Sequence, residues 1–257
     1  AAVLRFPASE AAAAVVVKHS NPCGVALGGS VAEALTRAIG ADPISAFGGI
    51  VAVNKPFDAA ACESLTGLFL ECLVAPEISA EARALLAAKP NLRLLELSPQ
   101  ACAAGADLQL RSIFGGVLAQ QQDHAPEDEQ QWQVVTERSP SQEEWQNLRF
   151  AWRVVRQVHS NAIVIARNGI TLGIGAGQMN RVGSAAIALD AAGSAAQGAA
   201  MASDGFFPFS DTVEKAAEFG ITAFIQPGGS KRDVDSIAAC NQAGLTMVLT
   251  GSRHFLH

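Results

Sequence analysis

Short runs of β-branched and aliphatic residues alternate with helix-forming segments along the chain, and this alternation constrains the fold more than any other feature. Near the carboxyl end, 221–226 predicts a strand, 233–243 a helix and 245–250 another strand. The turn-forming sequence PGGS separates the first strand from the helix. Two strands joined through a helix form a β-α-β unit, in which the strands run parallel. The sequence therefore predicts a layered α/β architecture.

The amino-terminal half contains the same kinds of element. The segment 13–17 (AAVVV) predicts a buried strand, and NPCG at 21–24 predicts the turn that follows it. Ser30 begins a capping box, S-x-x-E, which predicts the start of a helix. A strand is expected at 49–53, followed by alanine-rich helix at 59–73.

The carboxyl-terminal half adds a long helix and a hairpin. A second capping box starts at Ser141 and predicts a helix that ends near His159. The predicted strands 162–166 and 170–174 are joined by Arg-Asn-Gly, and Asn-Gly is the strongest short signal for a β-hairpin. Asp211 is expected to cap a later helix.

One polar, acidic stretch at 120–131 (QQQDHAPEDEQQ) has low complexity and predicts a solvated loop. We place a boundary between two subdomains there. On this interpretation 1–119 is the first subdomain, 120–140 a polar loop or linker, and 141–257 the second.

Composition excludes several classes of function. With 257 residues, 49% of them hydrophobic and 16% charged, the chain has the composition of a globular protein that buries a substantial core. Its formal net charge is -6, without the basic patch that nucleic-acid binding needs, and no apolar run has the length of a membrane span. We therefore expect no nucleic-acid partner and no membrane partner.

The cysteines are odd in number and scattered, without a C-x-x-C pair, which argues against a disulfide framework or a structural zinc site. They are Cys23, Cys62, Cys72, Cys102 and Cys240. We expect reduced thiols in a cytoplasmic protein.

Lys18 and His19 stand at the predicted carboxyl end of a buried strand, where ligands bind in open α/β sheets. A histidine there can act as a base near neutral pH, and a lysine can stabilise a developing oxyanion. The alternative is a solvated lysine beside a histidine bonded to a backbone carbonyl, and the pair alone favours it. Asn161, taken alone, is an ordinary polar residue at the start of a strand.

Three further segments combine turn formers with polar or aromatic side chains. The glycine run at 173–177 resembles a dinucleotide fingerprint, but Gln178 stands where that pattern needs glycine. Either this backbone passes close to a ligand and presents Arg181 to an anion, or it is a tight turn with a surface arginine. The loop 227–232 (PGGSKR) suits an anion or is a plain helix cap. The phenylalanines of 206–209 form either a slot for a flat heterocycle or core.

Seven segments together carry a family resemblance. They are VVKHSNPCGVA (16–26), DPISAFGGIVAVN (42–54), SNAIV (160–164), GIGAGQMNRV (173–182), ASDGFFPFSD (202–211), IQPGGSKRD (225–233) and RHFLH (253–257). In this order they resemble the signature blocks of the AICAR transformylase family, the formyl-transferring portion of bifunctional purine-biosynthesis enzymes. The blocks are long and cover essentially the whole chain.

The resemblance implies transfer of a formyl group from 10-formyltetrahydrofolate, as cosubstrate, to the amine of 5-aminoimidazole-4-carboxamide ribonucleotide (AICAR). It implies two cytidine-deaminase-like α/β subdomains and a homodimer with shared active sites. It also implies that no catalytic metal is used, because Cys23 is followed by Gly-Val-Ala and the P-C-x-x-C and H-x-E zinc ligands are missing. The family's upstream Arg-Tyr block and amino-terminal IMP cyclohydrolase domain are absent from this chain.

The resemblance also assigns roles to individual residues. The catalytic set is Lys18, His19 and Asn161. The nucleotide-binding set is Phe47, Gly48, Glu71, Arg181, Phe206 and Arg253. The folate-binding set is Val182, Asp211, Ser230 and Lys231.

On this interpretation His19 removes a proton from the amine as it attacks the formyl carbon. Lys18 either stabilises the oxyanion or protonates the departing folate nitrogen, and the sequence does not choose between the two. Two alternatives stay open: a nicotinamide-dependent oxidoreductase that uses 173–177, and an inert alanine-rich scaffold.

Overall fold

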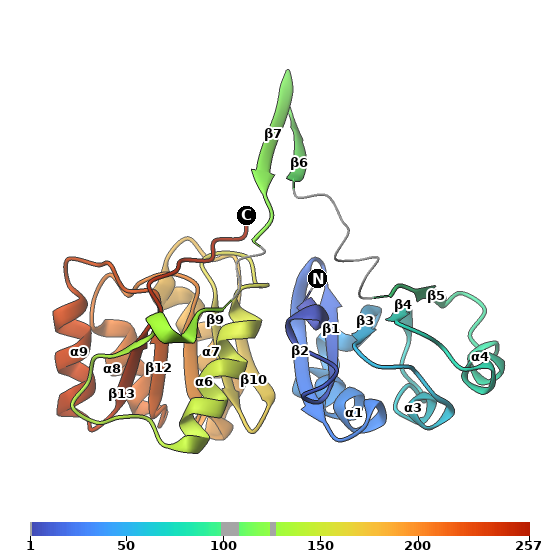
Figure 1. Cartoon of the computed structure of the whole chain (residues 1–257), viewed down its shortest axis with the longest axis horizontal. Coiled ribbons are helices and arrows are strands. Elements are labelled where there is room, and N and C mark those ends of the chain that lie inside the picture. Colours follow the sequence, from blue (N-terminus) through green and yellow to red (C-terminus); the bar gives the residue numbers. More distant parts are fainter. Residues whose placement is uncertain (1, 99–107, 124–126) are drawn as a thin grey trace.

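The computed structural model describes residues 2–98, 108–123 and 127–257, so Cys102 lies outside the described residues (Figure 1). Within these ranges, eleven strands form one mixed sheet with the order β5-β4-β3-β1-β2-β10-β9-β11-β12-β13-β8. The strands are β1 Ala12–Lys18, β2 Asn21–Gly28, β3 Gly49–Val53, β4 Leu70–Ala75, β5 Arg93–Glu96, β8 Gln133–Val134, β9 Ile163–Arg167, β10 Ile170–Gly175, β11 Ala200–Ser203, β12 Ala223–Gln226 and β13 Thr246–Leu249. The predicted α/β class is confirmed.

The sheet consists of one topology used twice. In each half an antiparallel hairpin is followed by three parallel strands, giving the orders β2-β1-β3-β4-β5 and β10-β9-β11-β12-β13. The halves meet where β2 and β10 lie side by side and antiparallel. Because of this direction, the tip of the β1–β2 hairpin lies at the same sheet edge as the carboxyl ends of β11–β13.

Helices cover both faces of the sheet. One face carries α1 Val31–Ala41, α3 Ala59–Glu63, α4 Ala80–Leu86, α7 Arg181–Ala192, α8 Asp211–Glu218 and α9 Asp233–Gln242, which pack in two clusters. The other face of the second half and of β1–β2 packs against α6 Gln142–Val155. Val16 and Ile165 belong to the first face, whereas Val15 and Val164 belong to the second. Burial on both faces explains why these strands are apolar without alternation.

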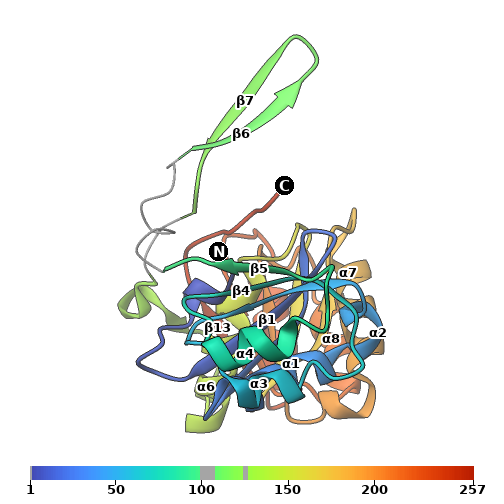
Figure 2. The same ribbon diagram turned by 90° about the vertical axis from the view of Figure 1, so that its right-hand side faces the viewer.

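The remaining short elements are η1 Ala2–Arg5, α2 Pro43–Ala46, η2 Glu129–Gln131 and η3 Gly193–Ala196. A separate hairpin, β6 Leu108–Ile113 and β7 Gly116–Gln121, projects from the body of the molecule in both views (Figures 1 and 2). No helix in the described part of the chain is long and apolar enough to cross a membrane.

Several local predictions are confirmed. Strands β12 and β13 are parallel and joined through α9. Asn168 (φ 54°) and Gly169 (φ 66°) form the left-handed turn of the β9–β10 hairpin. Ser141 makes both bonds of its capping box with Glu144, although α6 ends at Val155 rather than near His159.

Other local predictions are wrong. The β1–β2 turn is formed by His19 (φ 48°) and Ser20 (φ 75°), not by 21–24, because two left-handed residues suit a twisted hairpin. Pro22 lies inside β2, at the register shift opposite Val17.

Two further corrections concern helix ends. The helix expected at 59–73 stops at Glu63. Residues 70–75 form β4 instead, and most of its side chains are buried. Asp211 is the first residue inside α8 rather than its cap. Its Oδ1 accepts a bond from the N–H of Thr212, and Ser210 precedes the helix.

Candidate functional site

Lys18 and His19 lie at the tip of the β1–β2 hairpin. Lys18 ends β1, and its Nζ donates a hydrogen bond to the Phe47 carbonyl oxygen at 2.5 Å. His19 is part of the left-handed turn, and its side chain is exposed. The lysine therefore reaches toward the start of β3, while the histidine ring stays accessible.

The bend at Phe47–Gly48 lies directly beside the lysine. Gly48 has a φ of +67°, and a Cβ added there would lie 3.1 Å from Lys18 Nζ. The Gly48 N–H donates to the Phe69 carbonyl at 2.8 Å, and the rings of Phe47 and Phe69 lie 5.5 Å apart. Glycine at this position permits both the left-handed backbone and the close approach of the lysine.

In the second half, Arg181 bonds to the side chain of Asn161, and the buried Asp204 forms an ion pair with Arg181. Asn161 Oδ1 accepts from Arg181 Nη2 at 2.8 Å, and Asn161 Nδ2 donates to the Gln178 carbonyl at 2.7 Å. Arg181 Nη1 lies 2.5 Å from Asp204 Oδ1 and 2.8 Å from Ser203 Oγ. Arg181 is 6% exposed and Asp204 is fully buried. The arginine thus fixes the orientation of the Asn161 amide.

Asp204 organises the segment before β9 as well. One carboxylate oxygen accepts from the Ala162 N–H at 3.1 Å, and the other accepts from the Ser160 hydroxyl. Its backbone carbonyl accepts from the His254 N–H at 3.1 Å. Sequence analysis did not single out this residue, although it lies within the block 202–211. The feature of the sequence that could have identified Asp204 is an acidic residue directly after an apolar strand.

The two groups meet at one edge of the sheet. Asn21 Oδ1 accepts from the His159 N–H at 2.9 Å and lies 3.0 Å from His159 Nδ1. The His159 carbonyl accepts from the Gly177 N–H at 2.8 Å. The Lys18–His19 turn, the segment that leads into Asn161 and the loop after β10 therefore converge. Their convergence follows from the antiparallel placement of β2 and β10.

The carboxyl-terminal segment approaches the same place. A Cβ on Gly205 would lie 2.5 Å from Arg181 Nη2 and 2.8 Å from a ring carbon of Phe255. The Arg253 guanidinium lies 4.6 Å from the centre of the Phe255 ring. Phe206 follows Gly205 and is 36% exposed. Glycine at 205 therefore allows the segment that carries Arg253 to pack beside Arg181.

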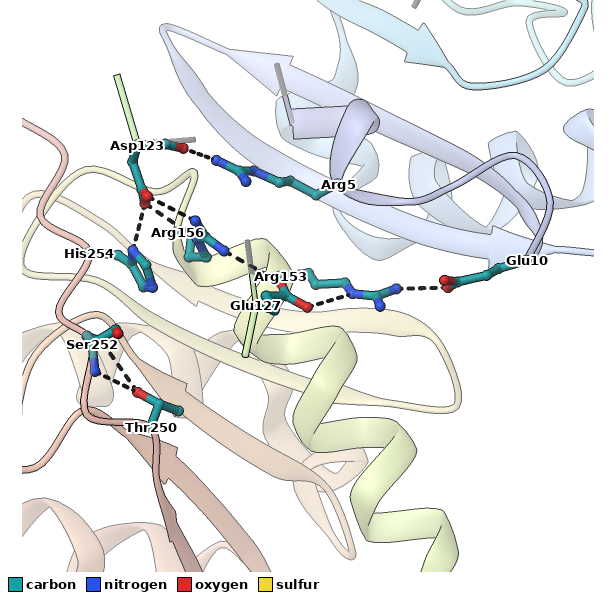
Figure 3. Close-up of polar contacts among 9 residues, drawn as sticks. All are labelled: Arg5, Glu10, Asp123, Glu127, Arg153, Arg156, Thr250, Ser252 and His254. Carbon is teal, nitrogen blue, oxygen red and sulfur yellow. Dashed lines mark hydrogen bonds and ion pairs between the residues drawn. The ribbon is translucent and has the colours of Figure 1, made fainter. Parts of the chain in front are cut away.

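An ionic network anchors this segment (Figure 3). Asp123 pairs with Arg156 at 2.8 Å and with His254 Nδ1 at 2.5 Å, and its carbonyl accepts from Arg5. Burial raises the pKa of Asp123, but the bonds from His254 and Arg156 outweigh it and hold that pKa well below its usual range. The network fixes the backbone next to Arg253, and sequence analysis missed it.

Two cavities lie near predicted residues. One, of about 660 Å³, opens beside the ionic network and includes Arg5 and Arg253 in its lining. Its volume suits a small-molecule ligand. The other, of about 480 Å³, is lined by Glu71 and Arg93, which form an ion pair at 2.6 Å. Lys18 and His19 line neither cavity, so the chemistry predicted for them lies outside both.

The predicted folate residues lie on one loop and at the starts of two helices. Ser230 and Lys231 belong to the loop before α9, and Asp211 begins α8. Phe209 links the two, because the Arg232 guanidinium lies 4.9 Å from its ring centre and Ser236 Oγ bonds to its carbonyl at 3.4 Å. Val182, the fourth member, is the second residue of α7 and half-buried.

The glycines of β10 have a packing role. A Cβ on Gly173 would lie 2.0 Å from the Ala188 carbonyl oxygen, and one on Gly175 would lie 1.9 Å from that of Ser184. The backbone at these positions passes close to α7. Helix packing, not a ligand, therefore explains the first two glycines of the 173–177 run.

No group of three or more His, Cys, Asp and Glu within the described ranges is arranged to hold a metal ion. Burial raises the pKa of the Cys23 thiol to about 11, so this sulfur is protonated at neutral pH.

Residues 1–191 match a family model described as AICARFT/IMPCHase bienzyme. The chain belongs to this family. Curated relatives named bifunctional purine biosynthesis protein PurH match nearly the whole chain. That of Parasynechococcus marenigrum (strain WH8102) is 64% identical over 95% of the chain, and that of Synechococcus elongatus is 56% identical over 99%. The chain spans about half of their length, 48% and 49% respectively.

Proposed function

We propose that this chain carries out the AICAR transformylase step, in which the formyl group of 10-formyltetrahydrofolate passes to the amine of AICAR. The relatives' name, bifunctional purine biosynthesis protein, supports this proposal. The observation that supports the step is the convergence of the exposed His19, the Lys18 ammonium and the Asn161–Arg181–Asp204 chain at one sheet edge.

In this reaction the AICAR amine attacks the formyl carbon, and the carbonyl oxygen becomes an oxyanion. His19 takes the proton that the amine nitrogen loses. The tetrahedral intermediate then collapses, the bond to the folate nitrogen breaks, and that nitrogen takes up a proton. Because the amine is conjugated with its ring, removing the proton during attack is the main contribution that a base makes here.

Lys18 and Arg181 keep donors available for this chemistry. The lysine ammonium has three N–H donors, and one is used by the Phe47 carbonyl. The others stabilise the oxyanion or supply the leaving nitrogen. The guanidinium of Arg181 has five donors, so its bonds to Asp204, Ser203 and Asn161 leave donors for the nucleotide.

The remaining parts of the proposal rest on the family resemblance. Phe47, Gly48, Glu71, Phe206 and Arg253 contact the nucleotide. The folate contacts are Val182, Asp211, Ser230 and Lys231. The protein works without a catalytic metal, as a cytoplasmic homodimer with sites shared between subunits.

His19 variants test the proposal. His19→Gly keeps the left-handed turn, and His19→Asn tolerates it, but neither side chain is a base. Both variants of the intact polypeptide are expected to lower kcat by about 100-fold or more with an unchanged Tm. The assay follows tetrahydrofolate formation by its ultraviolet spectrum and the formylated nucleotide by mass.

Turnover within about threefold of wild type would remove His19 from this role. If the wild-type protein instead reduced a nicotinamide, with its separate absorption band, the oxidoreductase alternative would replace the proposal. If the intact wild-type protein showed no turnover of either kind, the proposal would be wrong and the inert-scaffold alternative would replace it.

A further inference from the structure

Asn21, two residues after His19, is the first residue of β2 and makes a contact that none of the predicted roles uses. Its Oδ1 accepts from the His159 N–H at 2.9 Å and lies 3.0 Å from His159 Nδ1. Asn21 is also the ladder partner of Lys18 across the hairpin. A contact at Asn21 therefore restrains the turn that carries Lys18 and His19.

The contact determines the hydrogen positions of both side chains. A backbone N–H can only donate, so the Asn21 atom that faces His159 is the oxygen rather than the amide nitrogen. That oxygen can only accept, so its bond to the ring requires a hydrogen on Nδ1. In its neutral form His159 is therefore the Nδ1–H tautomer, and one oxygen accepts two hydrogen bonds from one residue.

The turn has a conformation that needs support from outside. His19 (φ 48°) and the residue after it (φ 75°) are both left-handed, a conformation that non-glycine residues keep only when the surrounding structure determines it. Lys18 Nζ ties the turn to the first half through the Phe47 carbonyl. Asn21 ties it to the second half through His159, 138 residues along the chain.

His159 connects the turn to Asn161 through the loop after β10. The His159 carbonyl accepts from the Gly177 N–H at 2.8 Å. The carbonyl of the next residue in that loop, Gln178, accepts from Asn161 Nδ2 at 2.7 Å. A short chain of hydrogen bonds that begins at Asn21 Oδ1 therefore joins the turn to the Asn161 amide.

We propose that Asn21 is a positioning residue, which uses His159 to hold the His19 turn in place relative to Asn161 for formyl transfer. The inference rests on the proposed function, in which His19 is the base. A base works only within hydrogen-bond reach of the proton that it removes, so an exposed histidine on an unsupported turn would lose much of its effect. Asn21 acts through the turn and is assigned no contact with the reacting atoms.

Kinetics of the intact polypeptide test this role. Asn21→Ala removes the bridging oxygen and is expected to lower kcat by about 10-fold to 100-fold, with the KM of each substrate within about threefold of wild type. His159→Phe keeps a ring and the backbone donor but loses the Nδ1–H, so a smaller loss is expected. Because both substitutions break the same contact, the double variant should match Asn21→Ala to within about twofold.

Asn241→Ala is the matched control. Asn241 Oδ1 accepts from the Glu137 N–H at 2.9 Å, so this variant also removes an amide oxygen from a backbone donor far away in the sequence. Tm should fall by a similar amount in the two alanine variants, but Asn241→Ala should keep kcat within about twofold of wild type. The inference would be overturned by a kcat for Asn21→Ala within about threefold of wild type, by losses that multiply in the double variant, or by an equal kcat loss in Asn241→Ala.

Histidine 15N NMR spectroscopy tests the contact without reference to activity. Above about pH 8, where an imidazole ring is ordinarily neutral, His159 should be the Nδ1–H tautomer in wild type and change toward Nε2–H in Asn21→Ala. The signal that disappears in His159→Phe identifies this ring. An Nε2–H tautomer in wild type would overturn the inference. Absence of formyl transfer by a wild type that has the Nδ1–H tautomer would instead overturn the proposed function, and the positioning role with it.

Discussion

At the scale of single residues, the buried ion pair of Arg181 and Asp204 affects both stability and site geometry. Removing one partner leaves an uncompensated charge in a buried position. We predict that Asp204→Asn lowers the free energy of unfolding by about 3–5 kcal/mol, and that Arg181→Met has a similar effect. Urea unfolding measures both losses.

The double variant supplies the control. With neither charge left, Arg181→Met/Asp204→Asn should cost less than the sum of the single losses by at least about 1 kcal/mol. Losses that add to within about 0.5 kcal/mol would show that the two side chains do not depend on each other.

Motifs in the sequence mark candidate residues, but they do not show which of these residues contact one another in the fold. Lys18 and Asn161 stand in recognisable blocks, but the sequence does not show that Arg181 holds Asn161, because their bond joins a strand start to a helix start 20 residues away. The Asp123–His254 contact spans 131 residues, and no local pattern signals it.

At the scale of elements, the start of α6 makes stability depend on pH. Burial raises the pKa of Glu144, but bonds from Arg138, Ser141 and Thr222 outweigh it and lower the pKa from 4.5 to about 2. A lowered pKa stabilises the fold above pH 4.5, and this contribution is lost as the pH falls from about 4.5 toward 2. We predict that Glu144→Gln costs on the order of 1–3 kcal/mol at pH 7.

This difference between Glu144→Gln and wild type should shrink as urea unfolding is repeated from pH 5 to pH 3. Glutamine keeps the bond to the Ser141 N–H, so the variant isolates the charge from the cap. The neighbouring exposed Glu143→Gln is the matched control and should change little at any pH. A constant Glu144→Gln loss across this range would contradict the assignment.

Elements with strong local chemistry were predictable. The Ser141 capping box and the Asn168–Gly169 turn form as expected, because both depend on contacts within a few residues. The structure of the segment 59–73 was not predictable in this way. Its alanines and leucines suit a helix locally, but its last residues form β4 because they pair with β3.

At the scale of the whole molecule, a buried side-chain hydrogen bond crosses the junction between the two halves. Where β2 meets β10, Thr171 Oγ1 accepts from the Val25 N–H at 3.0 Å, and Thr171 is 1% exposed. We predict that Thr171→Val, which keeps the shape, costs about 1–3 kcal/mol because the buried Val25 N–H loses its partner.

Hydrogen exchange at the Val25 amide provides the specific measurement and should accelerate in Thr171→Val. Thr171→Ser keeps the hydroxyl and should protect this amide. Equal exchange in the two variants would mean that another group bonds to Val25.

The α/β class was predictable from alternation of strands and helices, but the strand order within each half was not. The halves correspond in contacts rather than in residues: the Ala13 N–H bonds to the Asn54 side chain as the Ala162 N–H bonds to Asp204. Because one half uses an amide side chain and the other a carboxylate, the sequence does not show that these two positions correspond.

The close contact of Gly173 and Gly175 with α7 also bears on motion. Two main chains that touch leave no side chains between them to rotate or slide, so α7 cannot tilt without carrying β10 along. Arg181, the first residue of that helix, is therefore held in place relative to β10. Any movement at this sheet edge is therefore expected in the exposed turn at His19 rather than in α7.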